Sequence, residues 1–142
     1  MCYGQYLDMI GEGRALSGSE LTEINDFKTG ALLSAACRIG ACAAGAEESR
    51  IEAAGRFGQM LGLAFQIRDD MLDVLSSDAE LGKTVGSDAE ENKNTYMALY
   101  GPERCAQEVR ALTDGAVAIL QENFPEPDFL IALARSLETR RS

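Results

Sequence analysis

Residues 62–73 of the chain read GLAFQIRDDMLD, an apolar helical sequence interrupted by three aspartates. They lie near the end of a stretch, 46–75, that contains no proline and is rich in alanine, leucine and other strong helix formers. The stretch therefore predicts one long helix of about 45 Å, at a rise of 1.5 Å per residue. Because its second half is apolar on nearly every side, we expect this helix to lie in the middle of a helical bundle.

The rest of the chain carries the same helical signature. Helices are predicted over 1–10, 17–45, 95–100, 102–123 and 127–139, with a turn at 11–16 and a polar, glycine-containing loop at 76–94. No segment alternates polar and apolar residues in the manner of a half-buried strand. A chain of 142 residues can bury one hydrophobic core. The sequence thus predicts an all-α helical bundle in one domain, residues 1–142.

The helix predicted over 17–45 has a defined start, a defined end and one apolar face. Ser17 and Glu20 form an S-x-x-E capping box, in which each residue satisfies a free backbone N–H of the other. Gly45 follows a run of small residues and predicts the end of the helix. The apolar residues that recur at helical spacing predict a buried face: Leu21, Ile24, Ala31, Leu32, Ala35 and Ile39.

The composition excludes several classes of chemistry. The chain has no histidine, which rules out Ser-His and Cys-His nucleophile pairs and the HExxH zinc site within it. Its net charge of -10 argues against nucleic-acid binding, which needs a basic surface. No apolar run is long enough to predict a membrane span, and the first ten residues do not resemble a signal peptide. With four cysteines and no CxxC pair, we expect reduced thiols and a cytoplasmic protein.

The aspartates of the opening stretch belong to a polar line along the predicted helix. Asp69 and Asp73 are four residues apart and share one face, and Gln66 precedes Asp69 by three residues on the same line. Gly58 and Gly62 continue this line and predict a path without side chains beside it. No lysine or arginine lies three or four residues from any of the three aspartates, so their countercharge must come from elsewhere.

Two interpretations of these carboxylates remain open at this point. Carboxylates that face the inside of a bundle suit a hard divalent cation, Mg²⁺ or in its place Mn²⁺. On this interpretation Asp69, Asp70 and Asp73 are candidate metal ligands. The alternative is an acidic helix face in contact with solvent and without a ligand.

Three lysines are candidates for binding an anion. Lys28 lies on the apolar stripe between Ile24 and Leu32, where a lysine either extends to solvent or meets an anion. Lys83 and Lys93 lie among glycines in the loop over 76–94 and either cover a bound phosphate or belong to an ordinary solvated loop. Magnesium usually binds one or two carboxylates plus substrate phosphates, so a diphosphate would connect the lysines with the aspartates.

At this point the sequence resembles the trans-isoprenyl diphosphate synthases, a family that includes the farnesyl and geranylgeranyl diphosphate synthases. The resemblance rests on four segments that occur in the family's order and spacing and cover nearly the whole chain. They are Gly4-Gln5 with Leu7-Asp8, Lys28-Thr29-Gly30-Ala31-Leu32, the aspartate-rich stretch 62–73, and the run from Leu81-Gly82-Lys83 through Asn92-Lys93 to Thr95-Tyr96.

The resemblance implies an isoprenoid synthase fold, Mg²⁺, and two substrates, an allylic diphosphate and isopentenyl diphosphate. It implies that the diphosphate leaves the allylic substrate and that isopentenyl diphosphate attacks the resulting carbocation. Asp69 would hold the metal, with Asp70 and Asp73 as further ligands or nearby hydrogen-bond acceptors. The other implied roles are diphosphate binding for Lys28, Lys83 and Lys93, stabilisation of the carbocation for Lys28, Thr29 and Gln66, and substrate contact for Gln5 and Phe65.

The chain departs from the family pattern because it carries only one aspartate-rich motif. The resemblance places the first such motif and the isopentenyl-binding basic residues before the point where this sequence begins. We therefore expect the C-terminal half of a polyprenyl synthetase domain, inactive alone and forming a homodimer or pairing with an N-terminal half. The alternatives are a non-catalytic helical subunit of a complete synthase, a terpene-cyclase-like relative, and a purely structural acidic bundle.

Overall fold

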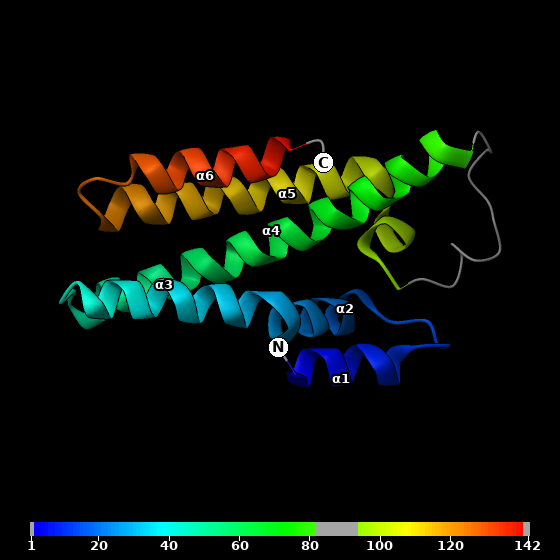
Figure 1. The fold of residues 1–142 in the computed structure, drawn as a ribbon, viewed down its shortest axis with the longest axis horizontal. Helices are drawn as coiled ribbons and strands as arrows, with labels where there is room; N and C mark the ends of the chain where they lie inside the picture. The colour runs from blue at the N-terminus through cyan, green and yellow to red at the C-terminus, as the bar shows by residue number, and fades with distance from the viewer. Residues whose placement is uncertain (1, 82–93, 141–142) are drawn as a thin grey trace.

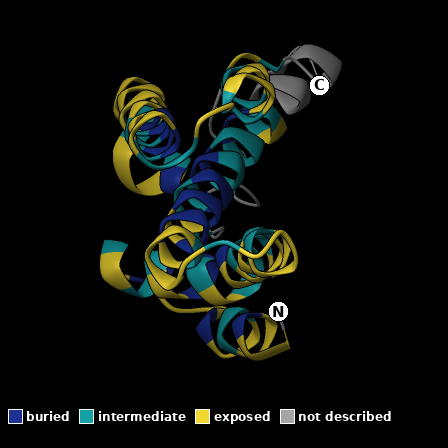
Figure 2. Ribbon diagram, turned by 90° about the vertical axis from the view of Figure 1, so that its left-hand side faces the viewer, coloured by how far each residue is buried: buried dark blue, intermediate teal, exposed yellow. Residues whose placement is uncertain are grey.

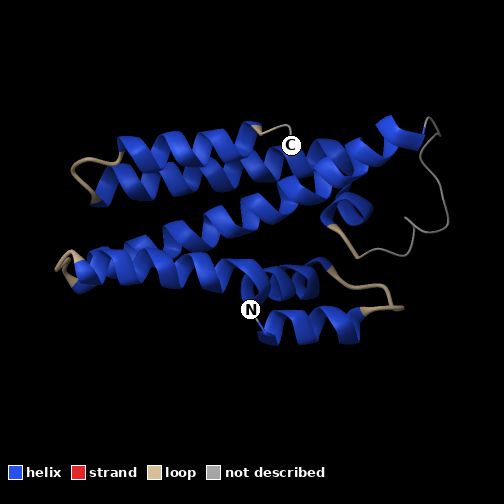
Figure 3. Cartoon of the chain, viewed as in Figure 1, coloured by secondary structure: helices blue, strands red, loops and turns tan. Residues whose placement is uncertain are grey.

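The structure is a computed structural model that describes residues 2–81 and 94–140, and every regular element in these residues is helical (Figure 3). The long helix α4 (Glu48–Leu81) runs between two groups of elements (Figure 1). On one side lie α5 (Tyr96–Asn123) and α6 (Asp128–Thr139), and on the other lie α1 (Cys2–Gly11), α2 (Gly18–Asn25), η1 (Asp26–Gly30) and α3 (Ala31–Ala43). The predicted all-α bundle is confirmed. No helix in these residues is long and apolar enough to span a bilayer.

Helix α4 forms the core of the bundle, as its apolar sequence predicted. Figure 2 shows its buried residues in the middle of the molecule, between the two groups of helices. Near its start, Phe57 and Leu61 pack in a cluster with residues of α5 and α6. About three turns later, Ile67 and Met71 pack in a second cluster that includes Leu21 of α2. The helix extends to residue 81 rather than 75, since neither glycine nor proline occurs between positions 75 and 82.

Three other predicted helix boundaries agree with the structure. The capping box of Ser17 and Glu20 is formed in full, and the backbone N–H of Ser17 lowers the pKa of the exposed Glu20 carboxylate to about 2. Gly45 has a φ of 72° and follows α3 as a helix stop. The break predicted between 95–100 and 102–123 is a kink inside α5, where Gly101 has a φ of 73° and precedes Pro102.

The helix predicted over 17–45 is helical throughout residues 18–43, but it contains a turn of π-helix, η1, that the sequence did not predict. Its closing hydrogen bond runs from the N–H of Ala31 to the carbonyl of Asp26, five residues earlier. The extra residue rotates the helix that follows, since each residue of an α-helix accounts for about 100°. The predicted apolar face therefore ends at Ile24: Leu32 and Ile39 are 56% and 69% exposed.

The glycines of α4 do not border an empty path, contrary to the expectation from their missing side chains. A Cβ atom at Gly62 would lie 2.8 Å from the Cα of Gly30, and one at Gly58 would lie 2.6 Å from the carbonyl oxygen of Leu33. The same close packing joins α1 to η1, because a Cβ at Gly4 would lie 2.3 Å from the backbone nitrogen of Lys28. These glycines therefore allow the backbones of α1, η1 and α4 to stack directly on one another.

The packing of η1 on α4 predicts a large cost for a single methyl group. Gly62→Ala should lower the free energy of unfolding by about 1–3 kcal/mol, because backbone atoms cannot yield as a flexible side chain can. Gly40→Ala in α3 is the matched control, since nothing lies within 4 Å of its added methyl group. The control should gain up to about 1 kcal/mol from helix propensity. Urea unfolding measures both variants, and a Gly62→Ala protein as stable as wild type would contradict the close packing.

Candidate functional site

A cleft of about 500 Å³ opens between α4 and the elements on its α1 side. Its walls bring together three of the residues predicted from sequence, Lys28 of η1 with Gln66 and Asp70 of α4. They also include Asp8 of α1 and Asn94, which precedes α5. Segments far apart in sequence thus converge on one polar cavity.

Lys28 meets an anion rather than extending freely into solvent. Its Nζ donates a hydrogen bond of 2.7 Å to the Asp8 carboxylate, and both side chains remain about two-fifths exposed. An ion pair this exposed contributes roughly 0–1 kcal/mol to stability, so a more strongly charged anion can compete for the lysine. The close contact of Gly4 with the backbone of Lys28 explains why α1 brings Asp8 to this point.

A chain of hydrogen bonds runs from η1 through α4 to α5. The hydroxyl of Thr29 donates to the side-chain oxygen of Gln66 at 3.3 Å. The amide nitrogen of Gln66 donates to one oxygen of Asp70, also at 3.3 Å, and the other oxygen of Asp70 accepts from the backbone N–H of Tyr96 at 3.1 Å. These bonds fix the orientation of the Gln66 side chain, because each end of its amide has a partner.

The environment of Asp70 differs from that of its neighbours. Burial raises the pKa of Asp70, while the hydrogen bonds from Tyr96 and Gln66 oppose this shift. The sign follows from the cost of removing a carboxylate from water, which disfavours its charged form. Both oxygens of Asp70 therefore accept hydrogen bonds from the protein, one from Gln66 of α4 and one from Tyr96 at the start of α5.

Asp69 contacts a residue from the other side of the molecule. The guanidinium of Arg140, the residue that follows α6, donates to the Asp69 carboxylate. The same guanidinium lies over the ring of Phe65, 4.2 Å from the ring centroid. Arg140 thus supplies a countercharge that no residue three or four positions away on α4 provides.

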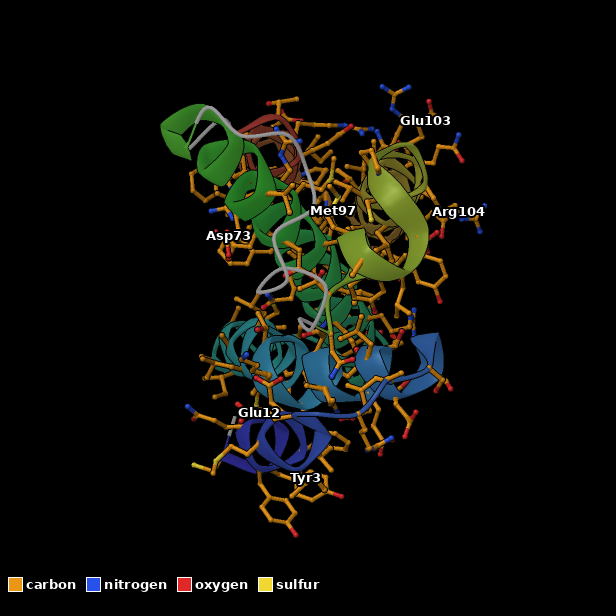
Figure 4. The ribbon with its side chains drawn as sticks, turned by 90° about the vertical axis from the view of Figure 1, so that its right-hand side faces the viewer. Tyr3, Glu12, Asp73, Met97, Glu103 and Arg104 are labelled. Carbon is orange, nitrogen blue, oxygen red and sulfur yellow. The ribbon has the colours of Figure 1, made fainter. Side chains whose placement is uncertain are left out.

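Asp73 is exposed and lies one turn beyond Asp69 on the same face of α4. Figure 4 looks onto this end of the bundle and shows Asp73 on the flank of α4 away from α5. In the described residues, no three acidic or sulfur side chains gather closely enough to hold a metal ion. Asp69 and Asp73 nevertheless fit magnesium in donor chemistry, because this ion takes oxygen ligands and needs only one or two protein carboxylates beside substrate phosphates.

One predicted residue, Gln5, lies outside this constellation. Gln5 is exposed on α1 and does not line the cleft. Lys83 and Lys93 fall outside the described residues.

Two residues at the site were not singled out from sequence. Asn94 donates to the carbonyl oxygens of Gly11 and Arg14 and accepts from the N–H of Leu16, which fixes the turn between α1 and α2 beside the cleft. Nothing in the sequence marks this role. Asp8 belongs to a segment that resembles the family, but the sequence assigned it no function. It reaches Lys28 because Gly4 lets α1 lie directly against the backbone of Lys28.

A long central helix that carries aspartates and borders a polar cleft, in a bundle made of helices, fits the class of all-α isoprenoid synthases. Comparison with known proteins agrees with this class. The family model for polyprenyl synthetase matches residues 1–125, and the chain belongs to the polyprenyl synthetase family.

Individual relatives give the same result. The chain is 40% identical to the farnesyl diphosphate synthase of Haemophilus influenzae, over all of its own length and 48% of that protein. Its fold matches the crystal structure of a geranylgeranyl pyrophosphate synthase with a TM-score of 0.84 and 26% identity, over 99% of this chain and 57% of that one. A geranyltransferase from Helicobacter pylori, crystallised with magnesium and isoprenyl diphosphate, matches with a TM-score of 0.74 and 31% identity, over 96% and 45% of the two chains. The chain thus spans about half the length of the curated relatives it matches.

The commitment of Asp70 to Tyr96 predicts a structural cost when the carboxylate is removed. Asp70→Ala should lower the free energy of unfolding by about 1–3 kcal/mol, because the Tyr96 N–H loses its acceptor. Asp70→Asn keeps an oxygen for this bond and should lose less. The control is Glu52→Ala, which removes an exposed carboxylate from the same helix and should change stability by less than about 0.5 kcal/mol. Equal stability of Asp70→Ala and wild type in denaturant titrations would contradict this role.

Proposed function

We propose that this chain supplies the diphosphate-binding, aspartate-rich half of a trans-prenyltransferase of isoprenoid biosynthesis. The reaction would join an allylic diphosphate to isopentenyl diphosphate. The observation that carries the proposal is the cleft in which Lys28, Gln66 and Asp70 meet. A lysine and a carboxylate on one cavity, with two further aspartates on the same helix α4, suit a metal-bound diphosphate.

The roles proposed for the residues follow from their contacts. Asp69 and Asp73 would hold Mg²⁺ (or Mn²⁺), with Asp70 as a hydrogen-bond acceptor beside them. The metal would supply positive charge that stabilises the departing diphosphate. Lys28 would leave Asp8 and bind the diphosphate, and Lys83 and Lys93 would bind the same diphosphate. Gln5 and Phe65 would contact the substrates.

Catalysis would depend on fixed charges rather than on a histidine base. The C–O bond of the allylic diphosphate would break, the double bond of isopentenyl diphosphate would attack the carbocation, and the released diphosphate would accept the proton that is then lost. The oxygen atoms of Thr29 and Gln66, held by their mutual hydrogen bond, would face the developing positive charge. Such preorganised dipoles stabilise charge without having to reorient during the reaction.

We further propose that a second chain covers the exposed apolar surfaces of this half bundle. Leu32 and Ile39 of α3 are exposed, and so are four apolar or aromatic residues of α1: Tyr3, Tyr6, Met9 and Ile10. Exposed apolar groups of this extent mark interaction surfaces. The partner would be a second copy or an N-terminal half. These surfaces also fit the second candidate function, a non-catalytic subunit of a complete synthase, and the four unpaired cysteines support a cytoplasmic location for either.

The proposed site predicts binding of inorganic pyrophosphate that requires magnesium. By calorimetry, Asp69→Ala and Lys28→Ala should each weaken this binding by about tenfold or more, because each removes one charge that faces the anion or its metal. Glu52→Ala removes an exposed carboxylate of α4 outside the cleft and should bind as wild type does. Unchanged affinity in Asp69→Ala would remove the metal assignment.

The chain alone should not catalyse the condensation. The purified 142-residue protein, given an allylic diphosphate, isopentenyl diphosphate and Mg²⁺, should show no product above the enzyme-free rate. Addition of a separately produced N-terminal half of a family member should restore turnover if the chain is half of an enzyme, and should not if it is a non-catalytic subunit. Steady turnover by the chain alone would refute its proposed incompleteness.

A further inference from the structure

Arg140 is held on α4 by contacts to three residues of a single helical turn. Its guanidinium donates to Asp69 and lies over Phe65, as described above. Its backbone carbonyl accepts two hydrogen bonds from Arg68, at 3.1 Å from Nε and 2.6 Å from Nη2. Both the side chain and the backbone of Arg140 are therefore fixed to α4.

This closed arrangement leaves part of Arg140 unsatisfied. Its Nε is buried and has no hydrogen-bond partner in the described part of the chain. A guanidinium and a carboxylate form their strongest pair through two parallel hydrogen bonds, whereas here a single nitrogen–oxygen contact joins them. A buried donor without a partner opposes the closed state, so the contact is suited to being broken.

Arg140 binds the Asp69 carboxylate, which the proposed function assigns to a metal ion. The Asp69 oxygen that accepts from Arg140 cannot also ligate a cation at the same point. Two positive groups on one carboxylate repel each other, and partial burial of the Arg140 side chain limits the screening by water. Binding of the metal and binding of Arg140 therefore oppose each other at Asp69.

We propose that Arg140 is a latch that competes with a divalent cation for Asp69 and is released when metal and diphosphate bind. This proposal rests on the proposed function, because it takes Asp69 as a metal ligand. By linkage, whatever weakens the latch strengthens metal binding, and metal binding weakens the latch equally. If the latch is closed in about nine molecules of ten, its loss tightens metal binding about tenfold.

The experiment measures binding of Mn²⁺, with and without inorganic pyrophosphate, by electron paramagnetic resonance of the free ion. Arg140→Gln should bind Mn²⁺ about three- to tenfold more tightly than wild type. Arg135→Gln is the matched control, because it removes the same charge from a neighbouring arginine that pairs with Asp114 and Glu138 instead. Arg68→Lys keeps its charge but cannot bind the Arg140 carbonyl through two nitrogens, so it should shift affinity in the same direction as Arg140→Gln.

A second measurement follows the latch itself. In wild type, Mg²⁺ with pyrophosphate should speed amide hydrogen exchange over residues 136–140, and in Arg140→Gln this segment should exchange rapidly from the start. Equal Mn²⁺ affinity in wild type and Arg140→Gln would overturn the latch alone. The latch would also be overturned if Arg68→Lys bound Mn²⁺ as tightly as wild type does. It would likewise be overturned if Mg²⁺ with pyrophosphate left amide exchange over residues 136–140 unchanged or slowed it. If none of the proteins binds Mn²⁺, the proposed function fails and the latch fails with it.

Discussion

The backbone contact between Gly62 of α4 and Gly30 of η1 is the constraint on which the site depends. Because of this contact, the backbone of η1 lies directly against the backbone of α4, with no side chains between them at this point. Gly4 repeats this arrangement on the outer face of η1. Asp8, Lys28 and Gln66 therefore reach one cavity from three successive layers, although none of them is close to another in sequence.

The geometry of α4 divides the three aspartates between two environments. Consecutive residues are separated by about 100° around a helix, so Asp70 points away from Asp69 even though they are neighbours in sequence. Asp70 meets the first turn of α5 and holds Gln66 in place, whereas Asp69 meets Arg140. One short motif thus contributes both a hydrogen bond that joins α4 to α5 and an ion pair with the residue that follows α6.

The features that could be predicted from sequence are those that local interactions decide. The apolar surroundings of residues 62–73 gave the central helix, and the capping box of Ser17 and Glu20 gave a helix start to the residue. The π-helical turn could not be predicted, because it depends on a choice between two hydrogen-bond patterns that packing against α4 decides. The partner of Asp69 lies 71 residues away, beyond the reach of any periodic pattern. The expectation of an empty path beside Gly58 and Gly62 was wrong for a general reason. Protein interiors are closely packed, so a neighbouring backbone fills the space that a missing side chain leaves on a buried helix.

The π-helical turn has a consequence for how this chain can vary. A chain lengthens or shortens by whole residues, so the rotation that η1 introduces between α2 and α3 cannot change in small steps. A deletion within Asp26–Gly30 would restore a regular helix, but it would also rotate the whole of α3 relative to α4. The inner surface that carries Lys28 and the outer surface that carries Leu32 and Ile39 therefore cannot evolve separately by insertion or deletion. Substitution is the route left open to either surface, and this favours a fixed length for the segment wherever both surfaces are in use.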